Sequence, residues 1–192
     1  MPIAVAAGAT ILCTTHAAPA VHNHFSKNPP IAEQIRIMVR NFGEVARAAA
    51  AHGLTIAFEN HQDYRASEVA AVIEGVGSPA LRANFDTANP VAVVEDPLEA
   101  ARAVGRYAVM VHLKDFRIQA STIVGEPRIL WAPIGRGDLE LESVLELLHA
   151  EAPDPDNLPL CLEVAPPHDH DPDPWVRGSL EHVRARFGRF LR

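Results

Sequence analysis

Residues 54–86, LTIAFENHQDYRASEVAAVIEGVGSPALRANFD, contain two short apolar runs with an amphipathic segment between them. The runs Leu54–Phe58 and Leu81–Phe85 have the length and composition of buried strands. Between them, Ser67 is a candidate N-cap and Gly77 a candidate C-terminal stop for a helix. A strand, a helix and a second strand over about 30 residues predict a parallel βαβ unit.

The same alternation continues on both sides of this unit. Further strands are expected at Thr10–Thr14, Ala108–Leu113 and Pro159–Val164. Further helices are expected at about Pro30–His52 with Gly53 at its C′ position, Pro97–Gly105 with Asp96 as N-cap, Leu141–Ala150, and Trp175–Leu191 with Trp175, Leu180, Val183 and Phe187 buried. This pattern predicts an α/β fold with a parallel sheet, in one domain that covers residues 1–192.

Two segments interrupt the alternation. The segment Phe116–Gly137 is long for a connection and contains the alternating run IVGEPRILWAPIG, so a β-hairpin is expected there. Gly135 and Gly137 are expected in a turn ahead of the next helix. The proline-rich segment Ala152–Pro159 is expected to be an exposed loop.

Composition limits the partners of the chain. Its 192 residues are 48% hydrophobic, and its formal net charge of −7 comes without a basic stripe, so no nucleic acid is expected. No run reaches the roughly 18 apolar residues that span a bilayer, and Lys27 is the first basic residue, which argues against a secretory signal. Cys13 and Cys161 lie in apolar runs and are expected to be buried, reduced thiols of a cytoplasmic protein.

Four polar residues follow or end strand candidates at equivalent positions, and they are Glu59, Asp86, His112 and Glu163. Glu59 and Asp86 are 27 residues apart, and Asp86 and His112 are 26 apart, which is the length of one strand, one helix and two loops. A single polar residue at such a position needs no function, because strands commonly end where the chain meets solvent. In a parallel barrel all these ends face one surface, where three carboxylates repel each other unless a cation or protons compensate.

Three carboxylates and one imidazole form a hard, mostly oxygen ligand set. Such a set suits Mn²⁺ or Mg²⁺, with Co²⁺ and Zn²⁺ as alternatives. A structural zinc site would be richer in thiolate. The sequence therefore predicts one divalent ion with open positions for a substrate. The run His168-Asp169-His170-Asp171 is flanked by prolines and is not expected to form a second metal cage.

Several motifs together resemble the xylose isomerase-like superfamily of sugar isomerases and epimerases. They are FENH (58–61), FDTAN (85–89), VHLKD (111–115), GRGDL (135–139) and LCLEV (160–164). The resemblance covers nearly the whole chain. It implies a (β/α) TIM barrel whose metal is held by the four candidate ligands, with Glu59 and Glu163 also acting as acid and base. It further implies that Arg117 binds substrate and that Asn89 replaces a usual histidine.

The resemblance also implies a barrel that lacks about three βα units at its start. Five strands do not close an eight-stranded barrel. The expectation is therefore a fragment, a chain with a misplaced start, or a chain that pairs with a complementing chain or with itself.

The function suggested by this reasoning is metal-dependent sugar isomerisation or epimerisation, with proton transfer through an enediolate. A sugar or polyol is the expected partner, and His16, His61, Asn89, Lys114 and Arg117 are the candidate substrate contacts. Asp115 is a candidate for orienting the metal-bound imidazole. Three alternatives stay open, namely a dehydratase acting on inosose or dehydroshikimate with the same site, an inactive truncated remnant, and a binding subunit. An endonuclease IV-like nuclease is disfavoured by the acidic charge.

Overall fold

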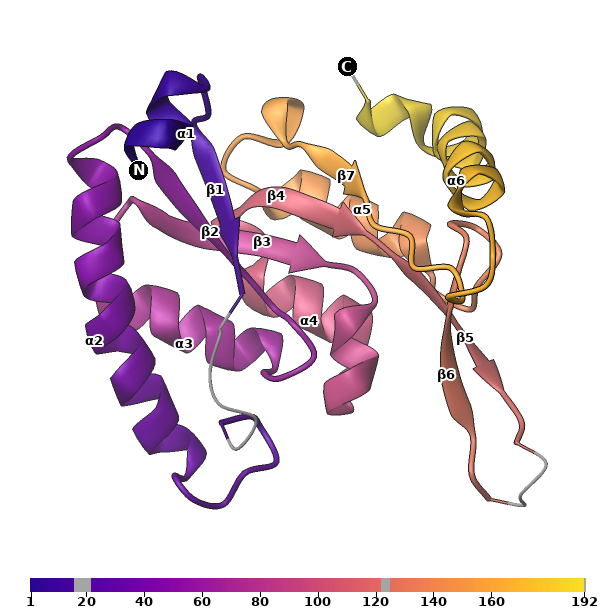
Figure 1. Cartoon of the computed structure of the whole chain (residues 1–192), viewed down its shortest axis with the longest axis horizontal. Coiled ribbons are helices and arrows are strands. Elements are labelled where there is room, and N and C mark those ends of the chain that lie inside the picture. The colour runs from indigo at the N-terminus through magenta and orange to yellow at the C-terminus, as the bar shows by residue number, and fades with distance from the viewer. Residues whose placement is uncertain (16–21, 122–124, 192) are drawn as a thin grey trace.

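Five parallel strands form the main sheet of the computed structural model, which describes residues 1–15, 22–121 and 125–191. The strands are β1 (Ile11–Thr14), β2 (Thr55–Glu59), β3 (Leu81–Asp86), β4 (Ala108–Leu113) and β7 (Leu160–Leu162). They lie in the order β1-β2-β3-β4-β7, and every neighbouring pair is parallel (Figure 1). The parallel sheet expected from the sequence is therefore confirmed, and the sheet forms part of a barrel.

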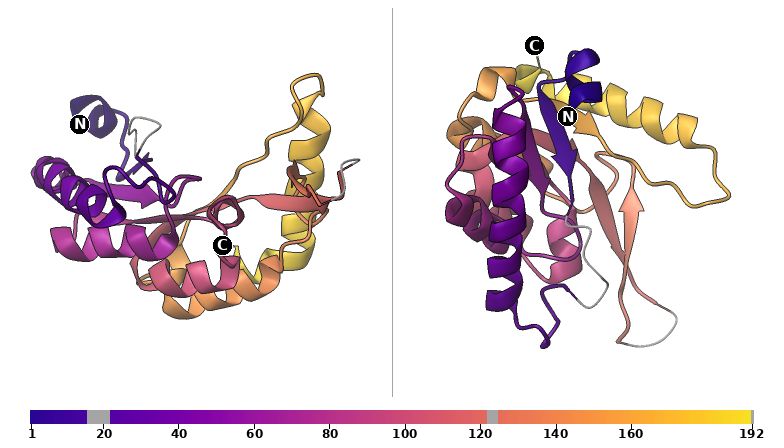
Figure 2. Two further views of the ribbon diagram at one scale, coloured as in Figure 1. Left: turned by 90° about the horizontal axis from the view of Figure 1, so that it is seen from below. Right: turned by 60° about the vertical axis from the view of Figure 1, so that its left-hand side comes forward.

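Helices cover the outer face of the curved sheet. They are α2 (Ile31–Ala50), α3 (Ala66–Val76), α4 (Pro97–Val104) and α5 (Leu141–Glu151), while α1 (Pro2–Ala6) precedes β1 and α6 (Pro172–Phe187) follows β7. Figure 2 shows that α3, α4 and α5 lie side by side under the sheet, whereas its concave face is open over the central strands. Within the described part of the chain, no helix is long and apolar enough to cross a membrane.

The hydrophobic core lies between the sheet and these helices. In β3, Leu81, Ala83 and Phe85 belong to the core, whereas the alternate residues Asn84 and Asp86 are polar. This period of two follows from the pleat of a strand, which points successive side chains to opposite faces. The polar face of the strands is thus directed to the concave side, where the carboxyl ends converge.

Two helix starts differ in how well the sequence predicts them. Asp96 caps α4 as expected, since its side chain accepts hydrogen bonds from the N–H groups of Leu98 and Glu99. The prediction of Ser67 as the cap of α3 is wrong, because the N-cap is Arg65. The backbone N–H of Arg65 donates to the carboxylate of Glu68 at 2.9 Å. The backbone N–H of Ala66 donates to the carboxylate of Glu95, 29 residues away in the sequence, at 2.8 Å. A tertiary contact thus replaces the serine cap.

Other local expectations need correction. Helix α2 ends with Ala51 as its C-cap, so Gly53 lies two residues past the cap, although its φ of +67° keeps it in the left-handed region. In α6, Val183 and Phe187 are buried as expected, but Trp175 and Leu180 are only half-buried.

The two cysteines are free, and Cys13 is exposed rather than buried. The reason is its position on β1, which is hydrogen-bonded only to β2 among the described strands and turns Cys13 to the open concave face.

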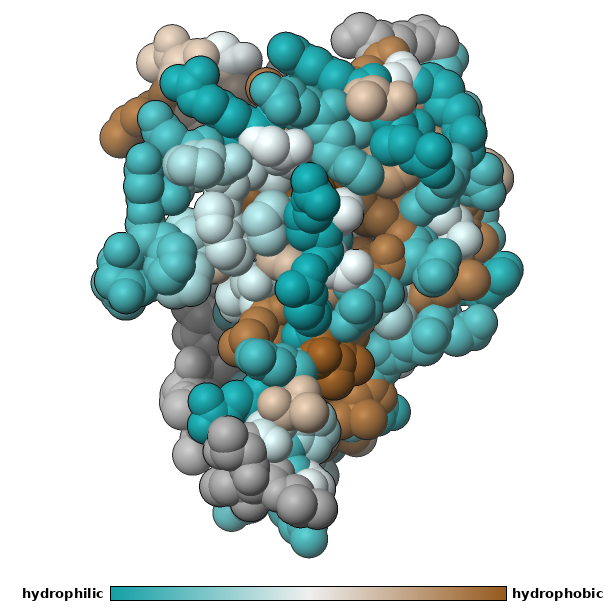
Figure 3. Space-filling view, turned by 90° about the vertical axis from the view of Figure 1, so that its right-hand side faces the viewer, coloured by the Kyte–Doolittle hydropathy of each residue, from teal (hydrophilic) through white to brown (hydrophobic). Residues whose placement is uncertain are grey.

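The expected hairpin is confirmed. Strands β5 (Asp115–Gln119) and β6 (Arg128–Ala132) pair antiparallel and extend from the carboxyl end of β4 (Figure 1). Its large exposed apolar side chains are Ile118, Ile129 and Leu130. Figure 3 shows this side of the molecule, with apolar side chains gathered in the lower half of the view.

One carboxylate fastens the hairpin to the turn that follows it. Asp115 Oδ2 accepts hydrogen bonds from the N–H groups of Gly135 at 2.9 Å and Gly137 at 3.0 Å. Its Oδ1 accepts from the N–H of Phe116 at 2.8 Å. The predicted turn at Gly135 and Gly137 therefore exists, and it is built around this carboxylate. Asp115 makes these bonds instead of orienting His112, so that expectation is wrong.

This turn has no room for a side chain at Gly137. A Cβ atom there would collide with the carboxylate of Asp115 and the carbonyl of Phe116, whereas Gly178 in α6 has open space around it. We expect Gly137→Ala to lower the free energy of unfolding by about 1–3 kcal/mol. The control Gly178→Ala should raise it by about 0.4–1 kcal/mol, because alanine restricts the unfolded chain. Urea unfolding measures both, and equal midpoints for the two variants would contradict this account.

Candidate metal centre

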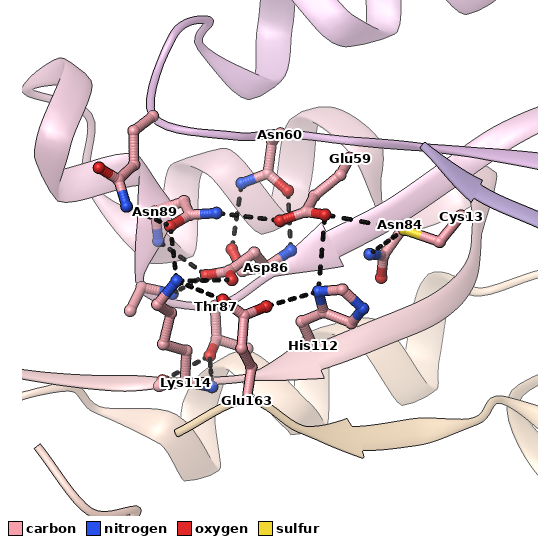
Figure 4. A network of polar contacts seen from close by, with 12 residues as sticks. Cys13, Glu59, Asn60, Asn84, Asp86, Thr87, Asn89, His112, Lys114 and Glu163 are labelled. Carbon is pink, nitrogen blue, oxygen red and sulfur yellow. Dashed lines mark hydrogen bonds and ion pairs between the residues drawn. The ribbon is translucent and has the colours of Figure 1, made fainter. Parts of the chain in front are cut away.

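The four candidate ligands meet at the carboxyl end of the sheet (Figure 4). One ligand atom from each of Glu59, Asp86, His112 and Glu163 lies within 4.8 Å of the others. We call these four residues the metal cluster. Register explains the convergence, because Asp86 pairs directly with His112 across β3 and β4. The spacing argument from the sequence thus places the four side chains correctly.

Charges of both signs are in contact within the metal cluster. His112 Nδ1 lies 2.8 Å from Glu163 Oε2 and 3.6 Å from Glu59 Oε2. The short approach to Glu163 has the distance of an ion pair but not the geometry of a hydrogen bond, so His112 Nδ1 has no hydrogen-bond partner among the described residues. An imidazole held this way has a ring nitrogen directed at the carboxylates.

Asp86 presents a second buried atom of the same kind. Its Oδ1 accepts hydrogen bonds from the N–H groups of Ala88 at 2.9 Å and Asn89 at 2.8 Å. Its Oδ2 is buried and has no hydrogen-bond partner in the described part of the chain. Buried polar atoms without partners are costly and usually have a ligand or ion to satisfy them. His112 Nδ1 and Asp86 Oδ2, together with the oxygen-rich donor set, fit a divalent cation.

The pKa values reflect the crowding of the metal cluster. Burial raises the pKa of Asp86 to about 7, although Lys114 opposes this shift. His112 lowers the pKa of Glu163 to about 2, against the effect of burial and with the help of Lys114. Burial disfavours the protonated imidazole, but the Cys13 thiol and the Glu163 and Glu59 carboxylates raise the pKa of His112 well above its usual value.

Two polar residues missed in the sequence hold the strand ends in place. Asn60 Nδ2 donates to the carbonyl of Asp86 at 3.0 Å, and Asn60 Oδ1 accepts from the N–H of Asp86 at 2.8 Å. Thr87 Oγ1 donates to the carbonyl of Lys114 at 2.6 Å and accepts from its N–H at 2.9 Å. The available signal is position, since each residue directly follows a ligand at the end of a strand.

Lys114 and Asn89, both expected to contact substrate, lie against the ligands themselves. Lys114 is buried, and its Nζ is 2.6 Å from Glu163 Oε1 and 3.6 Å from Asp86 Oδ2. Asn89 joins the same network, because its Nδ2 donates to Glu59 Oε1 at 3.1 Å and its Oδ1 accepts from Lys114 at 3.2 Å. Lys114 therefore neutralises part of the carboxylate charge.

Cys13 is a further neighbour that sequence reasoning missed. Its Sγ lies 3.7 Å from Glu59 Oε2 and accepts a hydrogen bond from Asn84 Nδ2 at 3.1 Å. Cys13, Glu59 and His112 form a second group with metal-ligand spacing. The thiol therefore adds a soft donor beside the hard ligand set.

Two of the remaining sequence candidates, His61 and Arg117, do not belong to the metal cluster. His16 lies outside the described residues. His61 is half-buried and interacts with the charge of Asp63. Arg117 is exposed on β5 and donates to the carbonyl of Arg136.

The acidic and histidine-rich run before α6 also lies apart from the metal cluster. Its members do not form a group with metal-ligand spacing in the described part of the chain. Asp171 instead caps α6 by accepting a hydrogen bond from the N–H of Asp173.

A parallel sheet with helices outside and a carboxylate and imidazole cluster at its carboxyl end defines a partial (β/α) barrel with a candidate metal centre. The family model described as xylose isomerase-like TIM barrel matches residues 1–186. The chain therefore belongs to the xylose isomerase-like TIM barrel family. The resemblance in the sequence motifs is confirmed.

One relative and three solved structures show the extent of the similarity. The uncharacterized protein YihM of Escherichia coli is 29% identical over 65% of this chain and 40% of its own length. A xylose isomerase-like TIM barrel protein from Mycobacterium smegmatis, in complex with magnesium, is 18% identical, with a TM-score of 0.70 over 100% of this chain and 65% of that one. A D-tagatose 3-epimerase-like protein is 16% identical, with a TM-score of 0.68 over 97% and 65%. The probable 3-DHS dehydratase of Bacillus anthracis is 14% identical, with a TM-score of 0.68 over 96% and 67%.

These similarities establish the fold. At 18%, 16% and 14% identity, the solved structures support no residue role in this chain. The chain spans 40% of the curated relative and 65% to 67% of these structures. The activity of the whole protein is therefore a proposal.

Metal binding should depend on pH. A cation binds the ionised carboxylate and the neutral imidazole, so it must displace protons from Asp86, whose pKa is about 7, and from His112, whose pKa is raised. We expect the affinity for Mg²⁺ or Mn²⁺ to rise from pH 6 to pH 8, by about tenfold per pH unit for each proton released. Isothermal titration calorimetry in two buffers of different ionisation enthalpy measures both the affinity for the metal and the number of protons released. An affinity that is equal at both pH values would contradict the prediction.

Asp86→Asn tests the ligand assignment without changing the shape of the side chain. Its Oδ1 can keep both backbone hydrogen bonds, while the ionic ligand atom is lost. We expect stoichiometric Mn²⁺ binding to disappear while the circular dichroism spectrum is retained. Asp96→Asn is a matched control, because Asp96 also accepts two N–H groups, at the start of α4, away from the metal cluster. Loss of metal from both variants, or from neither, would refute the assignment.

Proposed function

We propose that the chain carries the active site of a divalent-metal-dependent sugar isomerase or epimerase. The observation that supports this most directly is the pairing of two glutamates with one cation site. Glu59 and Glu163 come from β2 and from the residue after β7, and a carboxylate oxygen of each lies in the same 4.8 Å group. A substrate carbon held beside this group can exchange a proton with either carboxylate.

The two glutamates differ in their surroundings, which suits opposite roles. Glu163 is held ionised by His112 and Lys114, so it is in the charge state that a proton acceptor requires. Glu59 is buried and receives a hydrogen bond from Asn89. Glu59 is then the group that returns a proton to the opposite face or to the neighbouring carbon. The substrate passes through an enediolate between these two transfers.

The metal would be held by the four residues of the metal cluster. When bound, it would supply Lewis acidity that stabilises negative charge on the substrate oxygens. Mn²⁺ is the proposed ion because oxygen ligands dominate and one imidazole is present. The Cys13 thiol favours Zn²⁺ as an alternative. Among the similar structures, magnesium is named for the Mycobacterium smegmatis protein.

Substrate contacts are assigned to the residues that border the metal cluster. Lys114 and Asn89 are the strongest candidates, since both already contact its carboxylates. His61 and Arg117 are retained as outer contacts, with His16 as a candidate from the sequence alone. A sugar or polyol fits the site because its adjacent oxygens can replace the polar partners that the buried cluster atoms lack.

A dehydratase is the principal rival, because water elimination uses the same proton acceptor and the same Lewis acid. The similarity to a probable 3-DHS dehydratase keeps this class in view. The two reactions give different products, since elimination creates an enone or diketone that absorbs ultraviolet light. A chain that binds metal without any proton exchange would instead be a remnant or a binding subunit.

Glu163→Gln tests the proposal. The amide cannot accept the substrate proton, so we expect turnover to fall by about 10²-fold to 10⁴-fold at saturating Mn²⁺. The measurement is incorporation of solvent deuterium into a panel of ketohexoses, followed by nuclear magnetic resonance. Glu181→Gln is the control, since Glu181 is exposed on α6. Unchanged exchange in Glu163→Gln, or none in the metal-loaded native chain, would overturn the proposal.

A further inference from the structure

An apolar cavity of about 550 Å³ lies beside the metal cluster and outside it. It is formed between the hairpin strand β6, the segment that follows Glu163, and the first turns of α6. Its walls include Ile129, Trp131, Ala165, Pro166 and Trp175, with Arg117 as the single charged residue. A volume of this size is typical of a site for a small organic molecule.

One side-chain contact and one short stretch of chain relate this cavity to the metal cluster. The ammonium group of Lys114 lies 4.6 Å from the centre of the Trp131 ring, while the same group is 2.6 Å from Glu163 Oε1. Trp131 therefore lines the cavity and also contacts the lysine that pairs with Glu163. On the other wall, Ala165 follows Glu163 by two residues. The cavity therefore adjoins the metal cluster on two sides.

The chemistry of the walls differs from that of the metal cluster. Indole rings are flat and proline rings are rigid, and both bind aryl or alkyl groups by excluding water from the two surfaces that meet. A free sugar carries hydroxyl groups all round, and those placed against such walls would lose hydrogen bonds to water without replacement. The cavity therefore fits an apolar group better than a polar one.

The cavity is held by contacts that do not need a ligand. The β5–β6 pairing places Arg117 opposite Leu130, and Asp115 fastens the following turn. Pro166 and Pro167 restrict the backbone on the facing segment. A cavity fixed before binding loses little conformational entropy when it is filled.

We propose that this cavity binds an apolar substituent of the substrate, so that the enzyme acts on a sugar that keeps a free carbonyl and carries an aryl or alkyl group elsewhere. This substrate class rests on the proposed function, because the polar half of the molecule is taken to occupy the metal cluster. The contact of Lys114 with Trp131 places the cavity next to the metal cluster, which favours this occupant over a second copy of the chain on the apolar hairpin.

The protein carries its own reporter for this cavity. The chain has two tryptophans, Trp131 and Trp175, and both line it. Tryptophan fluorescence can therefore follow titrations with phenyl β-D-glucopyranoside and methyl β-D-glucopyranoside in the presence of Mg²⁺. We expect saturable binding of the phenyl compound at least about tenfold tighter than that of the methyl compound, since the ring leaves water for an apolar wall.

A filling variant separates the cavity from general surface binding. Ala165→Phe should remove the preference for the phenyl compound by occupying its place. Ala150→Phe, at the exposed end of α5, is the matched control and should retain it. Circular dichroism checks that both variants fold. Equal affinities in the native chain, or a preference that survives Ala165→Phe, would overturn the proposal.

Two further measurements separate this proposal from its neighbours. Sedimentation would detect a dimer. If the tryptophan fluorescence of that dimer did not change when the phenyl compound was added, a second copy of the chain would fill the apolar surface. The binding titration needs no turnover. A phenyl preference without deuterium exchange would therefore reject the proposed function alone, and exchange without the preference would reject the cavity assignment alone.

Discussion

Electrostatic repulsion among three carboxylates at one end of a parallel sheet is the constraint on which this structure depends. Parallel strands bring their carboxyl ends to one edge, so Glu59, Asp86 and Glu163 meet wherever the sheet forms. The chain compensates in part with Lys114 and in part through the raised pKa of Asp86, which favours the neutral form of that carboxyl group. A divalent cation would replace both compensations, which links metal binding to protonation and to the placement of Lys114.

The sequence predicts the elements that depend on local pattern. Apolar runs with regular spacing locate the five strands, and the recurrence of one polar residue at each strand end locates the metal cluster. The hairpin follows from the length of the connection and from the alternating run within it. These features are predictable because the pleat and the parallel direction fix where a side chain points once the strand is known.

Features that depend on partners distant in sequence are not predictable in this way. Ser67 has the chemistry of a cap, but Glu95 reaches the start of α3 from another loop. Lys114 lies two residues after the candidate ligand His112 and is expected from the sequence to face substrate, yet its long side chain turns back to Glu163. Cys13 lies in an apolar run and is nevertheless exposed, since burial depends on which strands neighbour β1. The alternation of apolar and polar residues predicts which face of the sheet a side chain lies on. It does not predict which other elements cover that face.

The carboxylate of Asp115 has a consequence for how this region moves. It binds amide groups 20 and 22 residues further along the chain, so the end of β4, the hairpin and the glycine turn are held by one acceptor. Segments that share such an acceptor open together in hydrogen exchange, as a single cooperative unit. Lys114 directly precedes Asp115, and its ammonium group lies over the ring of Trp131. Opening of this unit would therefore alter the metal cluster and the apolar cavity in one event. A ligand that contacts both the metal cluster and the apolar cavity would slow hydrogen exchange across the entire hairpin.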